Sequence, residues 1–211
     1  MKFDQHFLIN EGIAKQIVSY LNVKENESVL EIGPGKGILS KYLDKADLVE
    51  LDKDLCEKLR NKFSNYKIIN KNILKIKINY DKIIGNIPYS ISEPLLNKLM
   101  NSNFKLCILT IPEKFLEKGL LKLIIPNFLE IKTLMKIDKK EFSPVPRVNS
   151  KVIQIKKKEL NNEEKLIKKI YIQSDKKLKN LINTNLSFKE KRVRELNLEE
   201  WRQLLNDIKR A

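Results

Sequence analysis

Up to residue 157, short apolar runs alternate with amphipathic segments. Apolar positions at helical spacing predict a helix over residues 11–21, with Asn10 as its N-cap. Further helices are expected from residue 38, over residues 53–63 and from residue 92. Continuous apolar runs predict strands at residues 28–32, 48–52, 66–70, 80–85, 105–110, 128–137 and 151–156. This alternation predicts an α/β fold with a mainly parallel sheet, helices on both faces, and an antiparallel edge made by the last two strands.

The pattern changes near Lys157, where the apolar runs give way to amphipathic helical stripes. Helices are predicted over residues 162–173, 176–186 and 198–209, joined by short polar segments. We therefore expect two domains, an α/β domain over residues 1–157 and a small, basic, all-α domain over residues 158–211.

The composition is strongly basic, with 42 Lys and Arg against 27 Asp and Glu and a formal net charge of +15. Basic residues are densest in the helical tail. This excess favours a polyanionic partner, and nucleic acid is the first candidate. The alternative is that the lysines only solvate the surface.

Cysteine and histidine are too rare for several kinds of chemistry. The two cysteines, Cys56 and Cys107, lie in apolar surroundings without C-x-x-C spacing, and His6 is the single histidine. This argues against a disulfide framework, a metal site and a Ser-His or Cys-His pair, and favours a reducing compartment. The chain has no 18-residue apolar run and no signal-peptide pattern, so a cytoplasmic protein without a membrane association is expected.

A glycine-rich turn joins the first strand of the sheet to the helix expected from residue 38. The segment Gly33-Pro34-Gly35-Lys36-Gly37 stands where the backbone would approach a nucleotide-type ligand. The alternative is a tight structural turn. Glu50 ends the next strand, where a carboxylate can accept hydrogen bonds from two ribose hydroxyls. Asp52 and Asp54 are better suited to the start of the helix that follows.

The most informative stretch is Asn86-Ile87-Pro88-Tyr89, which follows a buried strand. A carboxamide, an imino acid and an aromatic ring gather there, at the edge of the sheet where ligands bind in open α/β folds. We interpret this tetrapeptide as the holder of an adenine base, to which the rest of the chain brings a methyl donor.

Five motifs together resemble those of the rRNA adenine dimethyltransferases. They are Gln5-His6-Phe7-Leu8, Glu31-Ile32-Gly33-Pro34-Gly35-Lys36-Gly37, Glu50-Leu51-Asp52, Asn86-Ile87-Pro88-Tyr89 and the segment 142–148. The resemblance covers residues 3–157 well and the tail more loosely, and it is greatest to the small-subunit branch in its archaeal form.

The resemblance implies a Rossmann-like class I methyltransferase domain that uses S-adenosylmethionine in ribosome biogenesis. The implied reaction adds two methyl groups to the exocyclic amine of each of two adjacent adenosines near the 3′ end of small-subunit rRNA. The implied partner is the immature small subunit, and a monomer is expected. The positions carried over to the cofactor are Gln5, His6, Leu8, Gly33, Gly35, Glu50, Leu51, Asn72, Ile73 and Asn86. Those carried over to the target base and its chemistry are Asn86, Pro88, Tyr89 and Phe142.

The residue types suit that reaction, because an adenine amine is a poor nucleophile and a sulfonium is a strong electrophile. The Asn86 oxygen and the carbonyl of Ile87 or Pro88 would accept hydrogen bonds from the amine as positive charge develops. Tyr89 would stack on the base and Phe142 would cover its other face. Alternatively, Asn86 is a turn residue, Tyr89 a core aromatic residue and Phe142 an anchor for its loop. His6 is expected as a polar wall of the cofactor pocket.

The sequence departs from the family pattern at two places. Asn72 stands where the family has Asp, which removes a negative charge beside the cofactor adenine but keeps an acceptor oxygen. Residues 111–127 are shorter than usual, which puts one wall of the target pocket in doubt. The expected phosphate contacts are Arg147, Lys176, Lys177, Lys179, Arg192 and Arg194, and for each of them the alternative is a solvated surface charge.

Two other functions remain open at this point. One is a large-subunit rRNA adenine methyltransferase, although residues 85–92 favour the small-subunit branch. The other is a non-catalytic RNA-binding assembly factor that has kept the fold, against which the intact Gly33, Glu50 and Asn86 argue.

Overall fold

The structure is a computed structural model that describes residues 5–117 and 119–210 of the 211-residue chain. The chain divides into two compact units, residues 1–115 with 130–157 and residues 116–129 with 158–211. The helical unit thus includes the segment 116–129 in addition to the tail. The functional assignment of the two expected domains stays a prediction.

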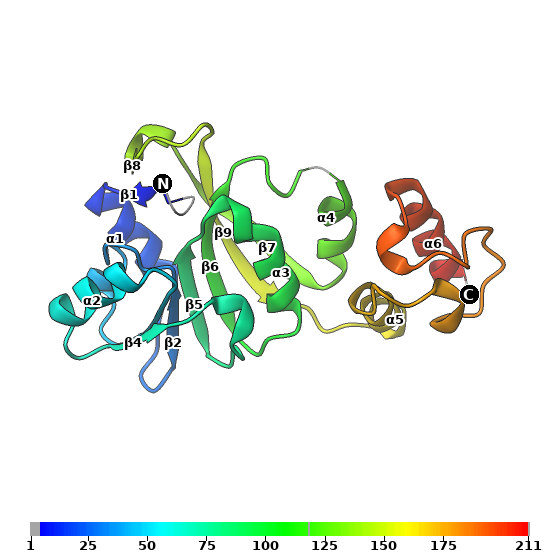
Figure 1. Ribbon diagram of the computed structural model, residues 1–211, viewed down its shortest axis with the longest axis horizontal. Helices are drawn as coiled ribbons and strands as arrows, with labels where there is room; N and C mark the ends of the chain where they lie inside the picture. The colour runs from blue at the N-terminus through cyan, green and yellow to red at the C-terminus, as the bar shows by residue number, and fades with distance from the viewer. Residues whose placement is uncertain (1–4, 118, 211) are drawn as a thin grey trace. The chain divides into compact units, whose positions relative to one another are not determined.

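The first unit is built on a sheet of seven strands in the order β4-β3-β2-β5-β6-β9-β7 (Figure 1). In that order the strands are β4 (Lys67–Asn70), β3 (Asp47–Glu50), β2 (Val29–Ile32), β5 (Lys82–Asn86), β6 (Leu106–Pro112), β9 (Ser150–Lys157) and β7 (Leu129–Ile137). Neighbours from β4 to β6 run parallel, and β9 runs antiparallel to β6. The expected fold class, a mainly parallel sheet with an antiparallel end, is confirmed.

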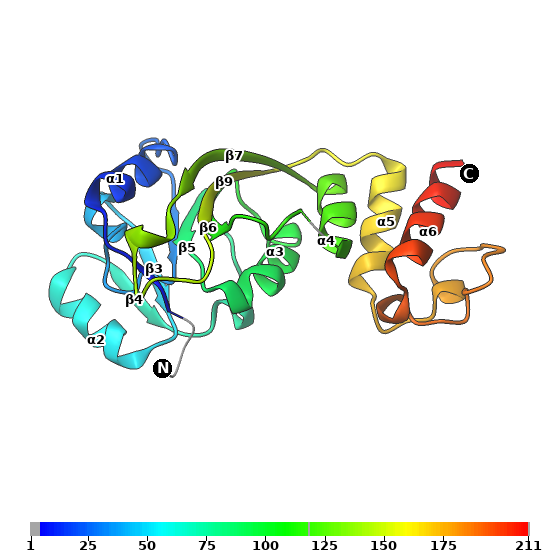
Figure 2. The same cartoon turned by 90° about the horizontal axis from the view of Figure 1, so that it is seen from above.

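The central strands β2, β5 and β6 are apolar because helices and loops cover both faces of the sheet there. Every residue of β2 is buried, and so are four of the five residues of β5. Figure 2 shows β7 and β9 side by side along one edge of the sheet, where β9 is inserted between β6 and β7.

Three helices complete the first unit: α1 (Glu11–Ser19), α2 (Lys53–Lys62) and α3 (Ser92–Met100). The Asn10 side chain caps α1 by accepting from the Ile13 N–H at 3.1 Å, as predicted. Asp52 caps α2 in the same way, which confirms its expected role at a helix N-terminus. The helix expected from residue 38 is only a 3₁₀ turn, Ser40–Tyr42, because i→i+3 hydrogen bonds tighten this segment.

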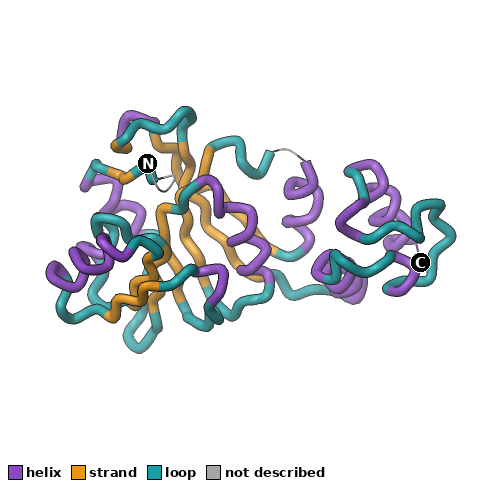
Figure 3. The backbone as a smooth tube through the Cα atoms, viewed as in Figure 1, coloured by secondary structure: helices purple, strands orange, loops and turns teal. Residues whose placement is uncertain are grey.

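A two-stranded pair that the sequence did not predict closes the N-terminal segment onto a distant loop. Strand β1 (Phe7–Leu8) runs antiparallel to β8 (Phe142–Ser143), and Figure 3 shows both as short orange segments outside the main sheet. The Ile9 N–H donates to the Glu141 carbonyl at 2.9 Å and extends this pairing. Residues 7–9 are therefore tied to the segment that precedes β9.

The second unit contains α4 (Gly119–Ile124), α5 (Asn162–Ile172) and α6 (Leu198–Arg210). A capping box of Asn161 and Glu164 starts α5, and Trp201 of α6 is buried with its ring edge-on to Tyr171 at 5.9 Å.

The predicted helix over residues 176–186 is wrong, because this segment contains only a 3₁₀ turn, Leu178–Asn180. Besides the hydrogen bonds of this turn, its backbone bonds across to residues 189–193. The N–H groups of Leu178 and Lys179 donate to the carbonyls of Lys191 and Lys189, and the Val193 N–H donates to Lys176. These cross-segment bonds take the place of most of the i→i+4 bonds that a helix over this segment would make.

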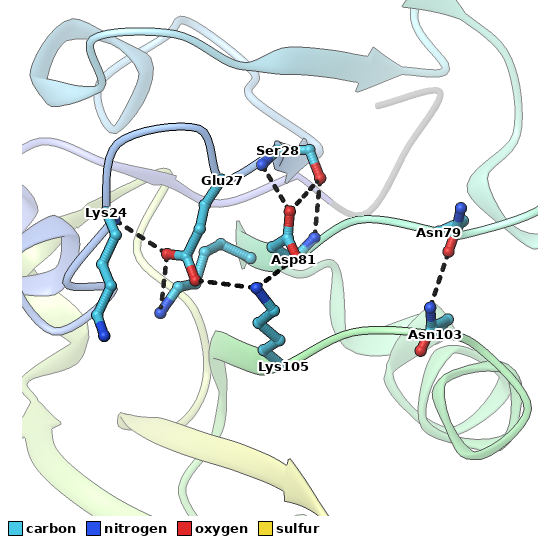
Figure 4. Close-up of polar contacts among 8 residues, drawn as sticks. Lys24, Glu27, Ser28, Asn79, Asp81, Asn103 and Lys105 are labelled. Atoms are coloured by element: carbon cyan, nitrogen blue, oxygen red, sulfur yellow. Dashed lines mark hydrogen bonds and ion pairs between the residues drawn. The ribbon is translucent and has the colours of Figure 1, made fainter.

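Charged residues at the amino end of the sheet neutralise a buried lysine. The Lys82 side chain is 9% exposed, and its ammonium lies 3.4 Å from the Glu27 carboxylate. Figure 4 shows Lys105 between Glu27 and Asp81, at 3.5 and 2.9 Å. The Asp81 carboxylate also accepts from the backbone N–H and the hydroxyl of Ser28, both at 2.9 Å. These contacts join the start of β2 to the starts of β5 and β6.

The cluster predicts how stability depends on pH. The Ser28 backbone N–H, followed by the Lys105 ammonium, holds the pKa of Asp81 well below its usual range. A carboxyl whose pKa is lowered on folding stabilises the protein above its unfolded-state pKa of about 3.9, and this contribution is lost as the pH falls further. Urea unfolding of Asp81→Asn between neutral and acid pH should therefore show a smaller loss of stability in acid than the wild type.

The exposed Asp44 gives a matched control, because Asp44→Asn removes a carboxylate without disturbing the cluster. If Asp81→Asn and the wild type lost stability in parallel as the pH fell, the Asp81 contacts would not stabilise the fold.

Candidate active site

A pocket opens at the carboxyl ends of β2, β3 and β5, under the N-terminal segment. Ten predicted site residues line it, namely Gln5, His6, Leu8, Gly33, Gly35, Glu50, Asn86, Pro88, Tyr89 and Phe142. The parallel register explains the convergence, because Ile32 of β2 lies opposite both Val49 of β3 and Gly85 of β5.

The glycine-rich turn forms one wall of this pocket in a conformation that favours glycine. Gly33 and Gly35 have φ angles of +64° and +57°. A Cβ at Gly35 would come within 2.9 Å of the Phe7 ring, so the N-terminal segment lies directly on the turn. The Lys36 ammonium lies 4.9 Å from the centre of the same ring. A side chain at Gly35 would therefore displace the Phe7 ring. We call the glycine-rich turn with the Phe7 ring on it the glycine cradle.

The Glu50 carboxylate is fixed at the end of β3 by three backbone N–H groups. One oxygen accepts from Leu51 and Asp52 at 2.8 and 2.9 Å, and the other accepts from Gly35 at 3.1 Å. Glu50 is 6% exposed and lines the pocket. Its position is therefore set before any ligand arrives, and a lone pair on the oxygen that accepts from Gly35 remains to accept a hydroxyl hydrogen.

Three residues predicted for the cofactor are not in the pocket lining. Leu51 is 50% exposed, and Ile73 is buried. The Asn72 oxygen accepts from the Leu74 N–H at 2.9 Å and so caps the 3₁₀ turn that follows. Their expected contact with the cofactor adenine stays a prediction.

Asn86, the last residue of β5, links this strand to the N-terminal segment. Its amide nitrogen donates to the His6 carbonyl oxygen at 2.9 Å. Its side-chain oxygen therefore lies on the opposite side of the planar amide group, where it can accept from a ligand.

Pro88 lines the pocket, but its carbonyl oxygen is turned toward α3. This oxygen accepts from the Ile91 N–H at 3.1 Å and from the Ser92 hydroxyl at 3.3 Å. Because these two donors use both lone pairs, the expected role of the Pro88 carbonyl as an acceptor for the base is not favoured. Of the two backbone acceptors considered, the geometry favours Ile87.

The aromatic residues of the site differ in their freedom to meet a base. Tyr89 is partly exposed, and its ring centre lies 5.7 Å from that of His6 at an angle of 37°. The His6 Nδ1 atom lies 2.8 Å from the Pro144 carbonyl oxygen. Phe142 is 2% exposed and belongs to the core cluster with Leu8, so its burial favours an anchoring role.

The pocket also contains Ile87, whose carbonyl was considered as an acceptor, and six residues to which the sequence analysis gave no role, namely Phe7, Glu31, Pro34, Lys36, Ile38 and Leu39. Glu31 is the most unusual of them, since it is 1% exposed and accepts from the Ser40 hydroxyl at 2.6 Å. Burial, with a smaller contribution from the Glu50 charge, raises the pKa of Glu31 to about 7. An acid inside a fully buried strand was the signal that could have found it.

The predicted RNA-binding residues lie outside this pocket. Arg147 is exposed in the loop before β9, and the other five are exposed in the second unit. Ion pairs join Lys177 and Lys179 to Glu190, at 3.2 and 2.9 Å, and Arg194 to Asp175. Their contact with RNA stays a prediction.

Within the described ranges, no three His, Cys, Asp or Glu residues are grouped so as to hold a metal ion. None of the helices there is both long and apolar enough to cross a membrane.

The sheet order and the pocket at its carboxyl edge define a Rossmann-like class I methyltransferase fold. Two solved structures show the same fold across nearly the whole chain. A dimethyladenosine transferase from Plasmodium falciparum covers 97% of this chain and is itself covered to 98%, with a TM-score of 0.70 and 22% identity. The 23S rRNA methyltransferase ErmE covers 96% and is covered to 99%, with a TM-score of 0.69 and 18% identity.

The family model described as "Ribosomal RNA adenine dimethylase" matches residues 1–203. The chain therefore belongs to the ribosomal RNA adenine dimethylase family, whose cosubstrate is S-adenosylmethionine. "Ribosomal RNA small subunit methyltransferase A" of Malacoplasma penetrans is 36% identical over 189 residues, 78% of this chain and 70% of the relative. The "Probable ribosomal RNA small subunit methyltransferase A" of Methanosarcina barkeri is 33% identical over 220 residues, 92% of this chain and 77% of the relative.

The pocket fits this cosubstrate, because the glycine cradle leaves room for it and the Glu50 carboxylate is already oriented to accept from a hydroxyl group.

Gly35→Ala should push the Phe7 ring away from the glycine-rich turn, because the added Cβ would lie within 2.9 Å of that ring. The left-handed backbone conformation alone should cost about 1–2 kcal/mol of folding free energy when the residue is alanine. Because the cradle is also disturbed, calorimetry should show a weaker affinity for S-adenosylmethionine than in the wild type. Gly119→Ala is the matched control, because Gly119 has a φ of +66° with nothing within 4 Å of an added Cβ. Equal donor affinities for the two variants would contradict the role given to the cradle.

Proposed function

We propose that this chain transfers methyl groups from S-adenosylmethionine to the exocyclic amines of two adjacent adenosines near the 3′ end of small-subunit rRNA. The observation that carries the proposal is the position of Asn86. Asn86 lies in the same pocket as the glycine cradle and Glu50, and its amide nitrogen donates a hydrogen bond to the His6 carbonyl oxygen. The names of the relatives support the small subunit as the source of the rRNA.

The donor side of the pocket is assigned to the turn and to Glu50. Gly33 and Gly35 would border the methionine part, and Glu50 would accept from the ribose hydroxyls. S-adenosylmethionine supplies an activated methyl group on a sulfonium, so the chain needs no general base to start the reaction. Its main task is to hold the amine in line with the methyl group.

The acceptor side is assigned to the end of β5. The Asn86 side-chain oxygen and the Ile87 carbonyl would accept the two hydrogens of the adenine amine. Acceptors fixed in this way favour a nitrogen with a localised lone pair and stabilise the positive charge that develops on it. Tyr89 would stack on the base, which leaves room beside the amine for a first methyl group while the second is added.

The RNA is assigned to basic residues beyond the pocket. Arg147, Lys176, Lys177, Lys179, Arg192 and Arg194 would contact phosphates. Lys177 and Lys179 both form ion pairs with the Glu190 carboxylate. When RNA binds, a phosphate would replace this carboxylate as their common partner.

The finer parts of the proposal rest on the sequence. The archaeal form is suggested by the motifs, while relatives from both Malacoplasma and Methanosarcina resemble the chain. The scarcity of cysteine suggests a cytoplasmic location. The immature small subunit is the expected substrate, and the protein is expected to be a monomer.

Asn72, Leu51 and Ile73 are proposed to lie beside the adenine of the cofactor. The brevity of residues 111–127 leaves the target pocket with less support than in the family.

The proposal is tested by calorimetry with S-adenosylmethionine, followed by methyl transfer to unmethylated ribosomal subunits. Donor binding with methylation of small subunits only is expected. Methylation of large subunits instead would favour the alternative large-subunit enzyme. Donor binding without methylation of either subunit would favour a non-catalytic assembly factor.

Asn86→Ala should nearly abolish methyl transfer, because it removes an acceptor aimed at the amine. Removing one preorganised group of this kind typically costs about 100- to 1,000-fold in kcat. Donor affinity, measured by calorimetry, should change much less. Asn103→Ala, which removes an amide bonded to Asn79 at the amino end of the sheet, is the control. If Asn86→Ala lost donor binding and transfer equally, Asn86 would belong to the cofactor side.

Lys176→Glu combined with Lys177→Glu should weaken RNA binding. If both lysines bind phosphates, the slope of log affinity against log salt should become shallower by about 1 for each phosphate that the variant no longer neutralises. Lys24→Glu with Lys45→Glu makes the same change in net charge at the amino end of the sheet and serves as the control. Equal affinities and salt slopes for the two double variants would remove the tail from the RNA interface.

A further inference from the structure

The hydroxyl of Tyr89 is held by a residue that lies far away in the sequence. Tyr89 Oη lies 2.9 Å from the Oγ of Ser150, the first residue of β9. Resting on the proposed function, we propose that Ser150 is a positioning residue, which fixes the plane of the Tyr89 ring for stacking on the target adenine.

The position of Ser150 is itself fixed by the sheet. Ser150 is 0% exposed and pairs with Pro112 in the antiparallel ladder between β6 and β9. A buried hydroxyl on a paired strand residue has little freedom to move. The Tyr89 ring is therefore held at its base by the backbone after Pro88 and at its tip by a rigid strand.

The register places this anchor on the same side of the sheet as Asn86. Asn86 pairs with Thr110, and Thr110 pairs with Val152. Ser150 precedes Val152 by two residues, and side chains two apart along a strand point to the same face. One face of the sheet thus presents both the acceptor for the amine and the anchor for the stacking ring.

The loop before β9 restrains Tyr89 from a second direction. The Pro144 carbonyl oxygen lies 2.8 Å from His6 Nδ1, and the His6 ring lies beside that of Tyr89. The segment 142–150 thus acts on the ring through Ser150 at its tip and through His6 at its side. Transfer to an amine needs the base oriented within about 10–20°, so a ring held at two points improves alignment more than affinity.

Ser150→Ala and Tyr89→Phe each delete this hydrogen bond, and Tyr89→Phe does so without touching the core. Each should lower kcat for methylation of small subunits by about three- to tenfold, the usual effect of one hydrogen bond. The Kd for S-adenosylmethionine should stay at the wild-type value. Because both changes remove the same bond, the double variant should lose no more than either single variant.

A spectroscopic readout separates positioning from general stability. The fluorescence of RNA with 2-aminopurine at the target position should be quenched when that base stacks on Tyr89. This quenching should be weaker in both variants than in the wild type. Ser102→Ala is the control, because Ser102 is 6% exposed and its hydroxyl donates to the Lys98 carbonyl at 2.9 Å, away from the pocket. It should match the wild type in both kcat and quenching.

The inference is overturned if Ser150→Ala and Tyr89→Phe keep the wild-type kcat and quenching while the wild type is active. Additive losses in the double variant would also overturn it, because the two groups would then act separately. A wild type that binds the donor but methylates no subunit would instead contradict the proposed function, and the role of Ser150 with it.

Discussion

The hydrogen bond from the Asn86 amide nitrogen to the His6 carbonyl oxygen joins the parts of the site to one another. Asn86 ends the central strand, and His6 belongs to the segment that lies on the glycine turn and pairs with β8. This bond orients the carboxamide, so that its oxygen is available to a ligand. It also holds Phe7 near Gly35, where the ring helps to bound the cradle. One contact therefore links the acceptor at the end of β5 to the wall of the donor site.

The two sides of the pocket are preorganised in different ways. On the donor side, three backbone N–H groups fix the Glu50 carboxylate, and positive φ angles open the glycine turn. On the acceptor side, Ser92 and Ile91 draw the Pro88 carbonyl away, while Asn86 remains at the pocket. Fixed groups of this kind need little rearrangement during reaction, which suits a transfer that depends on alignment and not on a base.

Local patterns were sufficient for most of the fold and for part of the site. Helix α2 with its Asp52 cap, the parallel strands and the clustering of Gly33, Glu50 and Asn86 follow from periodicity and from the rule that ligands bind at strand ends. The pairing of Phe7 with Ser143 was not predictable, because two-residue strands carry no periodicity. The segment 176–186 was misjudged, because several of its backbone hydrogen bonds are made with residues 189–193. The direction of the Pro88 carbonyl depends on a turn whose geometry no residue type specifies.

The proposed reaction requires that the target amine and the donor meet in the pocket at the end of β5. A bisubstrate analogue, in which adenosine is linked through its exocyclic nitrogen to the donor skeleton, tests this by calorimetry. We expect the analogue to bind the wild type at least about tenfold more tightly than the donor part alone, and we expect Asn86→Ala to lose this gain. An equal gain in the wild type and in Asn86→Ala would contradict it.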